Sequence, residues 1–111
     1  MLTYMTVDDY QRARLGGKAP VLVDVRDKSE FAQSHIPGAQ NMPLLTLSRD
    51  VLTQVPDKTT PLVVYCDVGI RQHHAARLLR SMGYQHVMEM QGGMLNYSRM
   101  GQEMRPGARP S

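Results

Sequence analysis

Residues 61–71 read PLVVYCDVGIR and include Cys66, the only cysteine in this chain of 111 residues. The first six residues are apolar and rich in β-branched side chains, which is typical of a buried, parallel strand. From residue 71 to 82 apolar side chains recur at helical spacing, and Gly83 follows as a helix end. The stretch therefore predicts a strand, a short loop that begins at the cysteine, and a helix.

The segments on either side continue this alternation of strands and helices. Further strands are predicted at 20–25, 40–42 and 86–90, and further helices at 6–17, 28–34, 43–55 and 94–100. Thr6 is a favourable N-cap, and Pro43 fits the first position of a helix. Short connections in this order favour a mostly parallel sheet with helices on both faces. We expect one domain over residues 1–104 and a flexible tail, rich in proline and glycine, at 105–111.

Composition and charge restrict the class of protein. The chain is 41% hydrophobic and 21% charged, as globular domains are, and its formal net charge is +3. Basic residues are scattered and aromatic residues are few, so no nucleic-acid partner is expected. A single cysteine gives no internal disulfide, and we find neither a signal-peptide pattern nor an apolar run of membrane length. A soluble, cytoplasmic protein without a membrane partner is expected.

The loop after Cys66 combines three features that suit an anionic sulfur. A cysteine between a strand end and a helix N-terminus faces unpaired backbone N–H groups and the positive end of the helix dipole. Gly69 allows the loop to curl around the sulfur, and Arg71 adds a cation five residues after the cysteine. Cys66 could instead be a small buried residue that completes the strand. The ordered set of residues favours a nucleophile.

Three segments together resemble a single-domain rhodanese, over about residues 5–104. They are LVDVRDKSEFAQSHIPGAQNMPL (22–44), VVYCDVGIRQHHAARLLRSMGY (63–84) and VMEMQGGMLNY (87–97). The resemblance implies a three-layer α/β/α fold around a central, mostly parallel five-stranded sheet. It also implies a thiosulfate sulfurtransferase-type enzyme in which the Cys66 thiolate takes a sulfane sulfur from thiosulfate or a persulfide. The acceptor would be cyanide, a thiol or a protein; no metal or cofactor is required, and a monomer is expected.

The resemblance also assigns roles to other residues. The loop Asp67, Val68, Gly69, Ile70 and Arg71 would cradle the persulfide with its N–H groups, and Arg71 would help to bind an anionic donor.

Asp24 and Arg26 lie at the end of the strand predicted at 20–25, and His35 follows the helix predicted at 28–34; a catalytic role is conceivable for each of them. We interpret them instead as structural support. Asp24 is expected to accept backbone N–H bonds and Arg26 to pair with Glu30, while His35 is expected to fix the turn at 35–39.

The sequence departs from the rhodanese pattern at three positions. Asp67 puts a carboxylate beside the nucleophile, where it would repel a dianionic donor. We therefore hypothesise that Asp67 weakens the use of thiosulfate and favours a less charged or protein-borne persulfide. Gln72 stands where serine is frequent, and Tyr97 replaces a tryptophan, which is expected to alter packing only.

Two other functions stay open at this point. Cysteine-dependent phosphatases and arsenate reductases also use a cysteine, an anion cradle and an arginine, but their arginine lies six residues after the cysteine, whereas Arg71 lies five after Cys66. The shorter loop favours attack on the smaller sulfane sulfur. A non-catalytic binding module of the same fold is the second alternative, and the presence of Cys66 argues against it.

Overall fold

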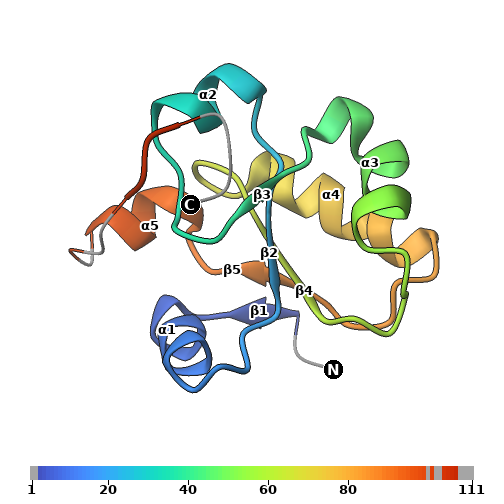
Figure 1. Cartoon of the computed structure of the whole chain (residues 1–111), viewed down its shortest axis with the longest axis horizontal. Coiled ribbons are helices and arrows are strands. Elements are labelled where there is room, and N and C mark those ends of the chain that lie inside the picture. The colour runs from blue at the N-terminus through green and yellow to red at the C-terminus, as the bar shows by residue number, and fades with distance from the viewer. Residues whose placement is uncertain (1–2, 100, 102–103, 108–111) are drawn as a thin grey trace.

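The centre of the molecule is a parallel sheet of five strands. A computed structural model describes residues 3–99, 101 and 104–107. The strands are β1 (Tyr4–Met5), β2 (Val21–Asp24), β3 (Gln40–Asn41), β4 (Leu62–Tyr65) and β5 (Val87–Met90), in the spatial order β1-β5-β4-β2-β3 (Figure 1). Each pair of neighbouring strands is parallel. The predicted parallel sheet is confirmed; β1 is an addition that the sequence did not reveal, because two residues are too few to show a period.

Helices cover both faces of this sheet and give three layers. They are α1 (Val7–Leu15), α2 (Lys28–Gln33), α3 (Leu47–Gln54), α4 (Ile70–Ser81) and α5 (Gly93–Arg99). In Figure 1, α3 and α4 lie to the right of the sheet, and α1 and α5 lie to its left. Within the part of the chain that the structure describes, no helix is long and apolar enough to cross a membrane.

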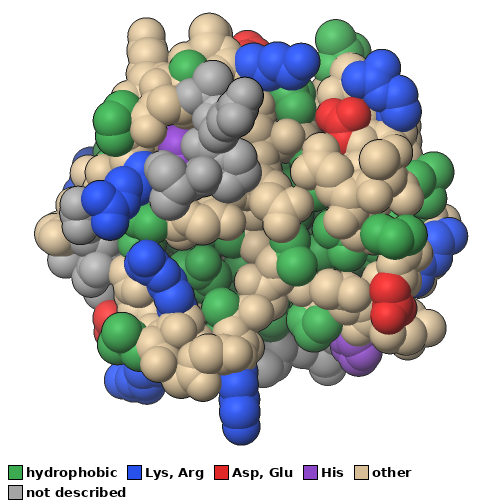
Figure 2. Space-filling view, viewed as in Figure 1, with side chains coloured by type: hydrophobic (Ala, Val, Ile, Leu, Met, Phe, Trp, Pro, Cys, Tyr) green, Lys and Arg blue, Asp and Glu red, His purple; other side chains and the backbone are tan. Residues whose placement is uncertain are grey.

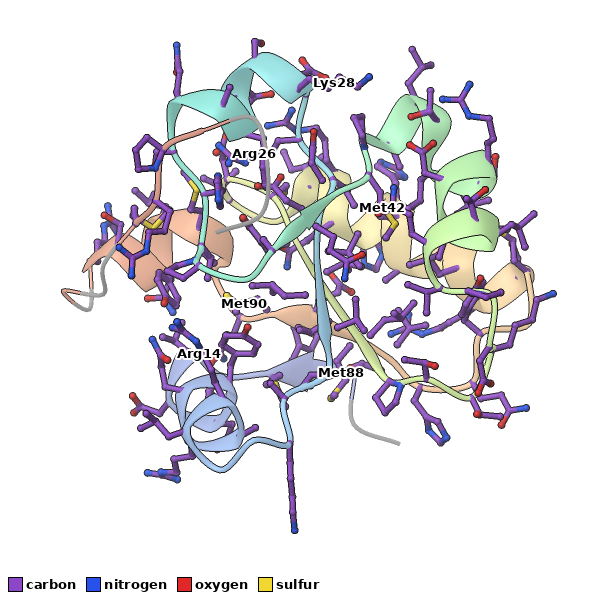
Figure 3. All side chains as sticks on the ribbon, viewed as in Figure 1. Arg14, Arg26, Lys28, Met42, Met88 and Met90 are labelled. Atoms are coloured by element: carbon purple, nitrogen blue, oxygen red, sulfur yellow. The ribbon has the colours of Figure 1, made fainter. Side chains whose placement is uncertain are left out.

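The alternation of side chains along β4 divides the core into two halves. Leu62 and Val64 pack against α3 and α4, whereas Val63 and Tyr65 pack on the opposite face, against α1, α2 and α5. The same division applies to methionines: Met42 belongs to the first half and Met90 to the second (Figure 3). On the face of the molecule seen in Figure 2, the Lys and Arg side chains are spread around the surface.

Helix ends follow the local chemistry of the sequence, with one exception. Thr6 caps α1, since its side-chain oxygen accepts a hydrogen bond of 3.0 Å from the Asp9 N–H, as predicted. The helix expected over 43–55 is different, because Pro43 has an extended backbone and does not open it. A 3₁₀ turn, η1 (Leu44–Thr46), comes first, and its Leu44 N–H donates to the Val25 carbonyl beyond β2. The regular helix therefore begins only at Leu47.

The chain beyond α5 returns to the domain. Backbone hydrogen bonds join His35 and Arg105 in both directions, at 2.7 and 2.8 Å, and the Gly107 N–H donates to the Ala32 carbonyl. The first residues of the predicted tail are thus hydrogen-bonded to the segment that contains and follows α2. The rest of that tail, 108–111, and residue 100 of the predicted last helix lie outside the described residues.

Candidate active site

Cys66 lies where β4 ends and the loop into α4 begins, at the carboxyl edge of the sheet. Its Sγ accepts hydrogen bonds from the backbone N–H groups of Gly69, at 3.2 Å, and Gln72, at 3.4 Å. The side chain is only 1% exposed. Gly69 has a φ of +123°, a conformation that L side chains rarely adopt, and this allows the loop to turn back over the sulfur. Two backbone donors and the N-terminus of α4 therefore face the sulfur and stabilise negative charge on it.

This arrangement differs in part from the cradle expected over residues 67–71. One of the two backbone donors to Sγ, that of Gln72, lies just beyond that range, within the first turn of α4. The side chains of Val68 and Ile70 point into solvent, where they are 58% and 70% exposed. Only the backbone of these two residues is thus available to shape the loop.

Gln72 contributes more than its N–H, a role that sequence reasoning missed. Its buried side chain accepts a hydrogen bond from the Cys66 N–H at 3.1 Å and donates one to the Met90 carbonyl at 2.9 Å. The amide therefore connects the ends of β4 and β5 and holds the cysteine backbone. A signal existed in the sequence: Gln72 shares a helical stripe with Ala75, Ala76 and Leu79, all of which are buried.

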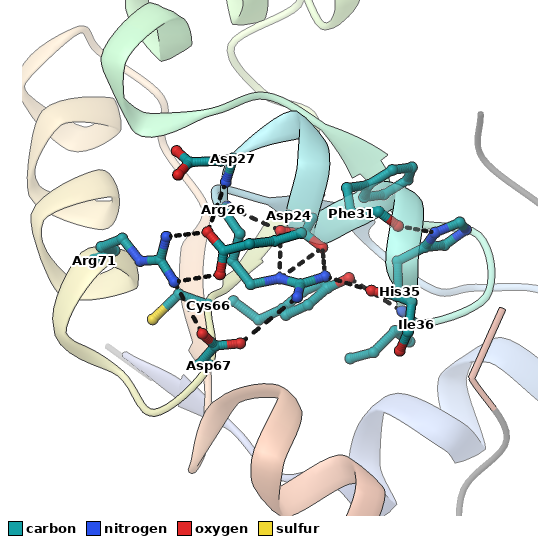
Figure 4. Close-up of polar contacts among 12 residues, drawn as sticks. Asp24, Arg26, Asp27, Phe31, His35, Ile36, Cys66, Asp67 and Arg71 are labelled. Atoms are coloured by element: carbon teal, nitrogen blue, oxygen red, sulfur yellow. Dashed lines mark hydrogen bonds and ion pairs between the residues drawn. The ribbon is translucent and has the colours of Figure 1, made fainter. Parts of the chain in front are cut away.

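Charged side chains form a network beside the loop (Figure 4). Arg71 donates two hydrogen bonds to Glu30, at 2.7 and 3.0 Å, and a third to Asp67 at 3.0 Å. Arg26 pairs with Asp24 at 2.8 Å and lies 3.6 Å from the other oxygen of Asp67. The bonds from Arg71 lower the pKa of Glu30 to about 2, and Glu30 in turn raises the pKa of Arg71. Arg71 is thus a cation whose donors are largely engaged.

The expected pairing of Arg26 with Glu30 is wrong. The guanidinium of Arg26 folds back onto the buried carboxylate of Asp24 and also donates to the Ser34 carbonyl at 2.6 Å. Glu30, in the first turn of α2, points instead toward the start of α4 and meets Arg71. Arg26 therefore pairs with Asp24, and Arg71 pairs with Glu30. The spacing of these residues in the sequence did not indicate the second pair.

The three residues interpreted as support make the contacts of structural residues. Asp24 is fully buried and accepts the Arg26 backbone N–H at 2.9 Å, as expected. His35 is also fully buried; its Nδ1 lies 3.0 Å from the Phe31 carbonyl, and its ring stacks on the Phe31 ring at 3.8 Å. These contacts tie the turn at 35–39 to α2.

The start of α5 completes the other side of the cysteine loop. The Met94 N–H donates to the Cys66 carbonyl at 2.8 Å, and the Leu95 N–H donates to the Asp67 carbonyl at 3.0 Å. Gly93 makes this approach possible, since a Cβ there would lie 2.6 Å from the Asp67 carbonyl oxygen. Tyr97, farther along α5, is buried and accepts a hydrogen bond from Gln11, so it fills the core on this face.

In chemical terms, the site offers one thiol whose anion is stabilised by backbone donors, beside a carboxylate-rich ion-pair network. Among the described residues, no group of three His, Cys, Asp or Glu side chains is placed to hold a metal ion. The arrangement suits a nucleophilic sulfur that carries a group by a covalent bond.

Comparison with known proteins agrees with this fold. The family model for the rhodanese-like domain matches residues 7–100. The thiosulfate sulfurtransferase PspE of Escherichia coli is 40% identical over 72 residues, which are 65% of this chain and 68% of that protein. The crystal structure of a thiosulfate sulfurtransferase from Pseudomonas aeruginosa superposes with a TM-score of 0.89 at 32% identity, over 96% of this chain and 20% of that one.

Relatives with other names share the same domain. The tRNA uridine(34) hydroxylase of Protochlamydia amoebophila is 34% identical over 86 residues, which cover 72% of this chain but only 27% of that protein. The chain thus spans 27% of this hydroxylase and 20% of the Pseudomonas protein. With a family model that covers most of its length and a matching fold, the chain belongs to the rhodanese-like domain family.

Proposed function

We propose that this protein is a sulfurtransferase that carries a sulfane sulfur as a persulfide on Cys66. The observation that carries the proposal is the position of the Cys66 Sγ. This atom lies at the N-terminus of the twelve-residue helix α4 and accepts hydrogen bonds from two backbone N–H groups. Because a thiolate, and not a thiol, attacks sulfur, an environment that stabilises negative charge at Sγ favours this chemistry. The relative named thiosulfate sulfurtransferase supports the same assignment.

The proposed reaction consists of two displacements. The Cys66 thiolate attacks the outer sulfur of the donor, a new S–S bond forms, and the old bond to that sulfur breaks. The leaving group keeps the electron pair, as sulfite from thiosulfate or as a thiolate from a persulfide. An acceptor then attacks the terminal sulfur of the Cys66 persulfide and releases the cysteine as a thiolate, so cyanide becomes thiocyanate and a thiol becomes a persulfide. No external oxidant or reductant is needed.

The proposal also covers the sulfur donor, the sulfur acceptor, the oligomeric state and the cellular compartment. A small sulfur-containing anion or a persulfide would be the donor, and a thiol or a protein the acceptor, with the domain acting as a monomer. A cytoplasmic location fits this cycle, because the resting cysteine must stay reduced and cytoplasmic thiols are kept reduced.

Mass spectrometry of the intact protein tests the proposal directly. After treatment with thiosulfate or with a small-molecule persulfide, and removal of excess reagent, we expect the mass to rise by one sulfur atom. The added sulfur should be lost on incubation with cyanide, with formation of thiocyanate. Cys66→Ser should gain no sulfur under the same conditions. If wild-type protein gains none from either donor, the chain is a non-catalytic binding module instead.

A further inference from the structure

We infer, resting on the proposed function, that Asp67 selects the sulfur donor. It disfavours dianionic thiosulfate and leaves Cys66 to take sulfur from the persulfide of a neutral or cationic thiol. The inference depends on where the carboxylate of Asp67 lies and on how it occupies the arginines beside the loop.

Among the described residues, both arginines beside the loop, Arg26 and Arg71, are engaged by carboxylates. The network contains three carboxylates and two guanidiniums, so one negative charge is left without a matching cation. The carboxylates are those of Asp24, Glu30 and Asp67, and the guanidiniums are those of Arg26 and Arg71. The network therefore has a net charge of −1, and the thiolate adds a second negative charge. Asp67 is the carboxylate shared by both arginines, so a neutral side chain at this position would change the net charge of the network to zero.

Asp67 is also the most exposed of the three carboxylates, since the side chain of Glu30 is 29% exposed. It follows Cys66 in the chain, and its side chain is 44% exposed, whereas the side chain of Asp24 is fully buried. Next to it, the exposed side chains of Val68 and Ile70 are apolar. A persulfide attached to a carbon chain can pack against such side chains, whereas thiosulfate has no carbon atoms and spreads its charge over three oxygens and its outer sulfur.

The size of the effect follows from Coulomb's law. A dianion about 6 Å from one carboxylate, at the dielectric constant of water, is repelled enough to change a rate constant about tenfold. A donor whose ammonium group balances its persulfide charge has almost no net charge to be repelled. Asp67 should thus lower the rate constant for thiosulfate about tenfold relative to that for a donor without net charge.

The test measures the rate of persulfide formation on Cys66, by quenching and mass spectrometry, with thiosulfate and with cysteamine persulfide. Asp67→Asn should accelerate the thiosulfate reaction about tenfold and the cysteamine persulfide reaction by less than twofold. Asp57→Asn is the control. It changes the net charge equally but precedes β4, at the opposite end of that strand from Cys66, and asparagine can still accept the hydrogen bonds from Thr59.

Salt dependence of the wild-type reaction gives a second measurement that needs no variant. Because ions screen repulsion, the thiosulfate reaction should become faster as ionic strength rises, whereas the cysteamine persulfide reaction should change little. Equal acceleration of both donors by Asp67→Asn, no acceleration at all, or slower thiosulfate transfer at high salt overturns the inference and leaves the proposed function standing. No adduct from either donor overturns both.

Discussion

Gly93→Ala should separate the α5 N-terminus from the cysteine loop. Gly93 has a φ of +63°, and a Cβ at this position would lie 2.6 Å from the Asp67 carbonyl oxygen and 2.7 Å from the Cys66 carbonyl oxygen. A Cβ atom is essentially never found closer than 3.0 Å to another heavy atom of this kind, so the two backbones must separate by roughly half an ångström. The atoms that must move belong to backbone on both sides, and a side-chain rotation cannot relieve the clash.

The expected cost has two parts. An alanine in the left-handed region loses about 1–2 kcal/mol. Separation also weakens the two hydrogen bonds from α5 to the carbonyls of Cys66 and Asp67, at about 0.5–1.5 kcal/mol each. Gly17→Ala isolates the first part, because Gly17 has a φ of +72° and a Cβ there would meet nothing within 4 Å. Gly93→Ala should therefore lower the free energy of unfolding by about 1–3 kcal/mol more than Gly17→Ala.

Urea unfolding, followed by circular dichroism, measures this difference at one temperature. The same difference should appear as a Tm lower by roughly 5–20 °C for a domain of this size. The folded fraction of Gly93→Ala should also form the Cys66 persulfide more slowly, because the carbonyls that α5 holds belong to the cysteine loop. Equal losses of stability in the two variants would refute the reasoning, since they would mean that the close approach of α5 costs nothing to disturb.

Three other substitutions test side-chain contacts of the cysteine loop and of the turn at 35–39. Gln72→Leu leaves two buried backbone groups unpaired, so we expect a loss of about 2–6 kcal/mol in urea unfolding and slower persulfide formation. An unchanged rate would contradict a positioning role. Since Arg71 lowers the pKa of Glu30 to about 2, this pair stabilises the folded state above pH 4.5 and loses its contribution as the pH falls toward 2. The stability advantage of wild type over Glu30→Gln should hence be smaller at pH 3 than at pH 7, and a constant advantage would contradict it. Tyr65→Phe removes the buried acceptor of the Ile36 N–H and should cost about 1–3 kcal/mol, which thermal unfolding can measure, whereas a cost near zero would show that this N–H finds another partner.

Most of the fold could be predicted because its signals are local. Apolar runs predicted β2 and β4. Thr6 predicted the start of α1, and Gly83 predicted the end of α4. What could not be predicted depends on distant contacts. The η1 turn arises because Leu44 bonds to the Val25 carbonyl, a contact set by how the chain crosses the end of β2. The sequence indicated a regular helix from Pro43, because proline suits a first helical position and the apolar residues that follow recur at helical spacing.

The candidate site shows the same limit. Cys66 and Gly69 could be identified because the loop carries its own pattern, a strand end followed by a glycine and a helix. The partner of Arg71 could not, since Glu30 is 41 residues away and meets it only after α2 and α4 pack. Gln72 was visible as a polar residue on an apolar helix face, but its two backbone partners are Cys66, just after β4, and Met90, in β5.

The ion-pair network also bears on the choice among the remaining functions. An arginine that is hydrogen-bonded to Glu30 and Asp67 is poorly placed to bind the equatorial oxygens of a phosphate, which is the role a phosphatase needs. A phosphate monoester would meet the same repulsion from Asp67 as thiosulfate does. It follows that failure of a thiosulfate assay would not by itself distinguish a sulfurtransferase from a binding module. Only an assay that includes a persulfide of low charge separates a site that rejects dianions from a site that performs no chemistry.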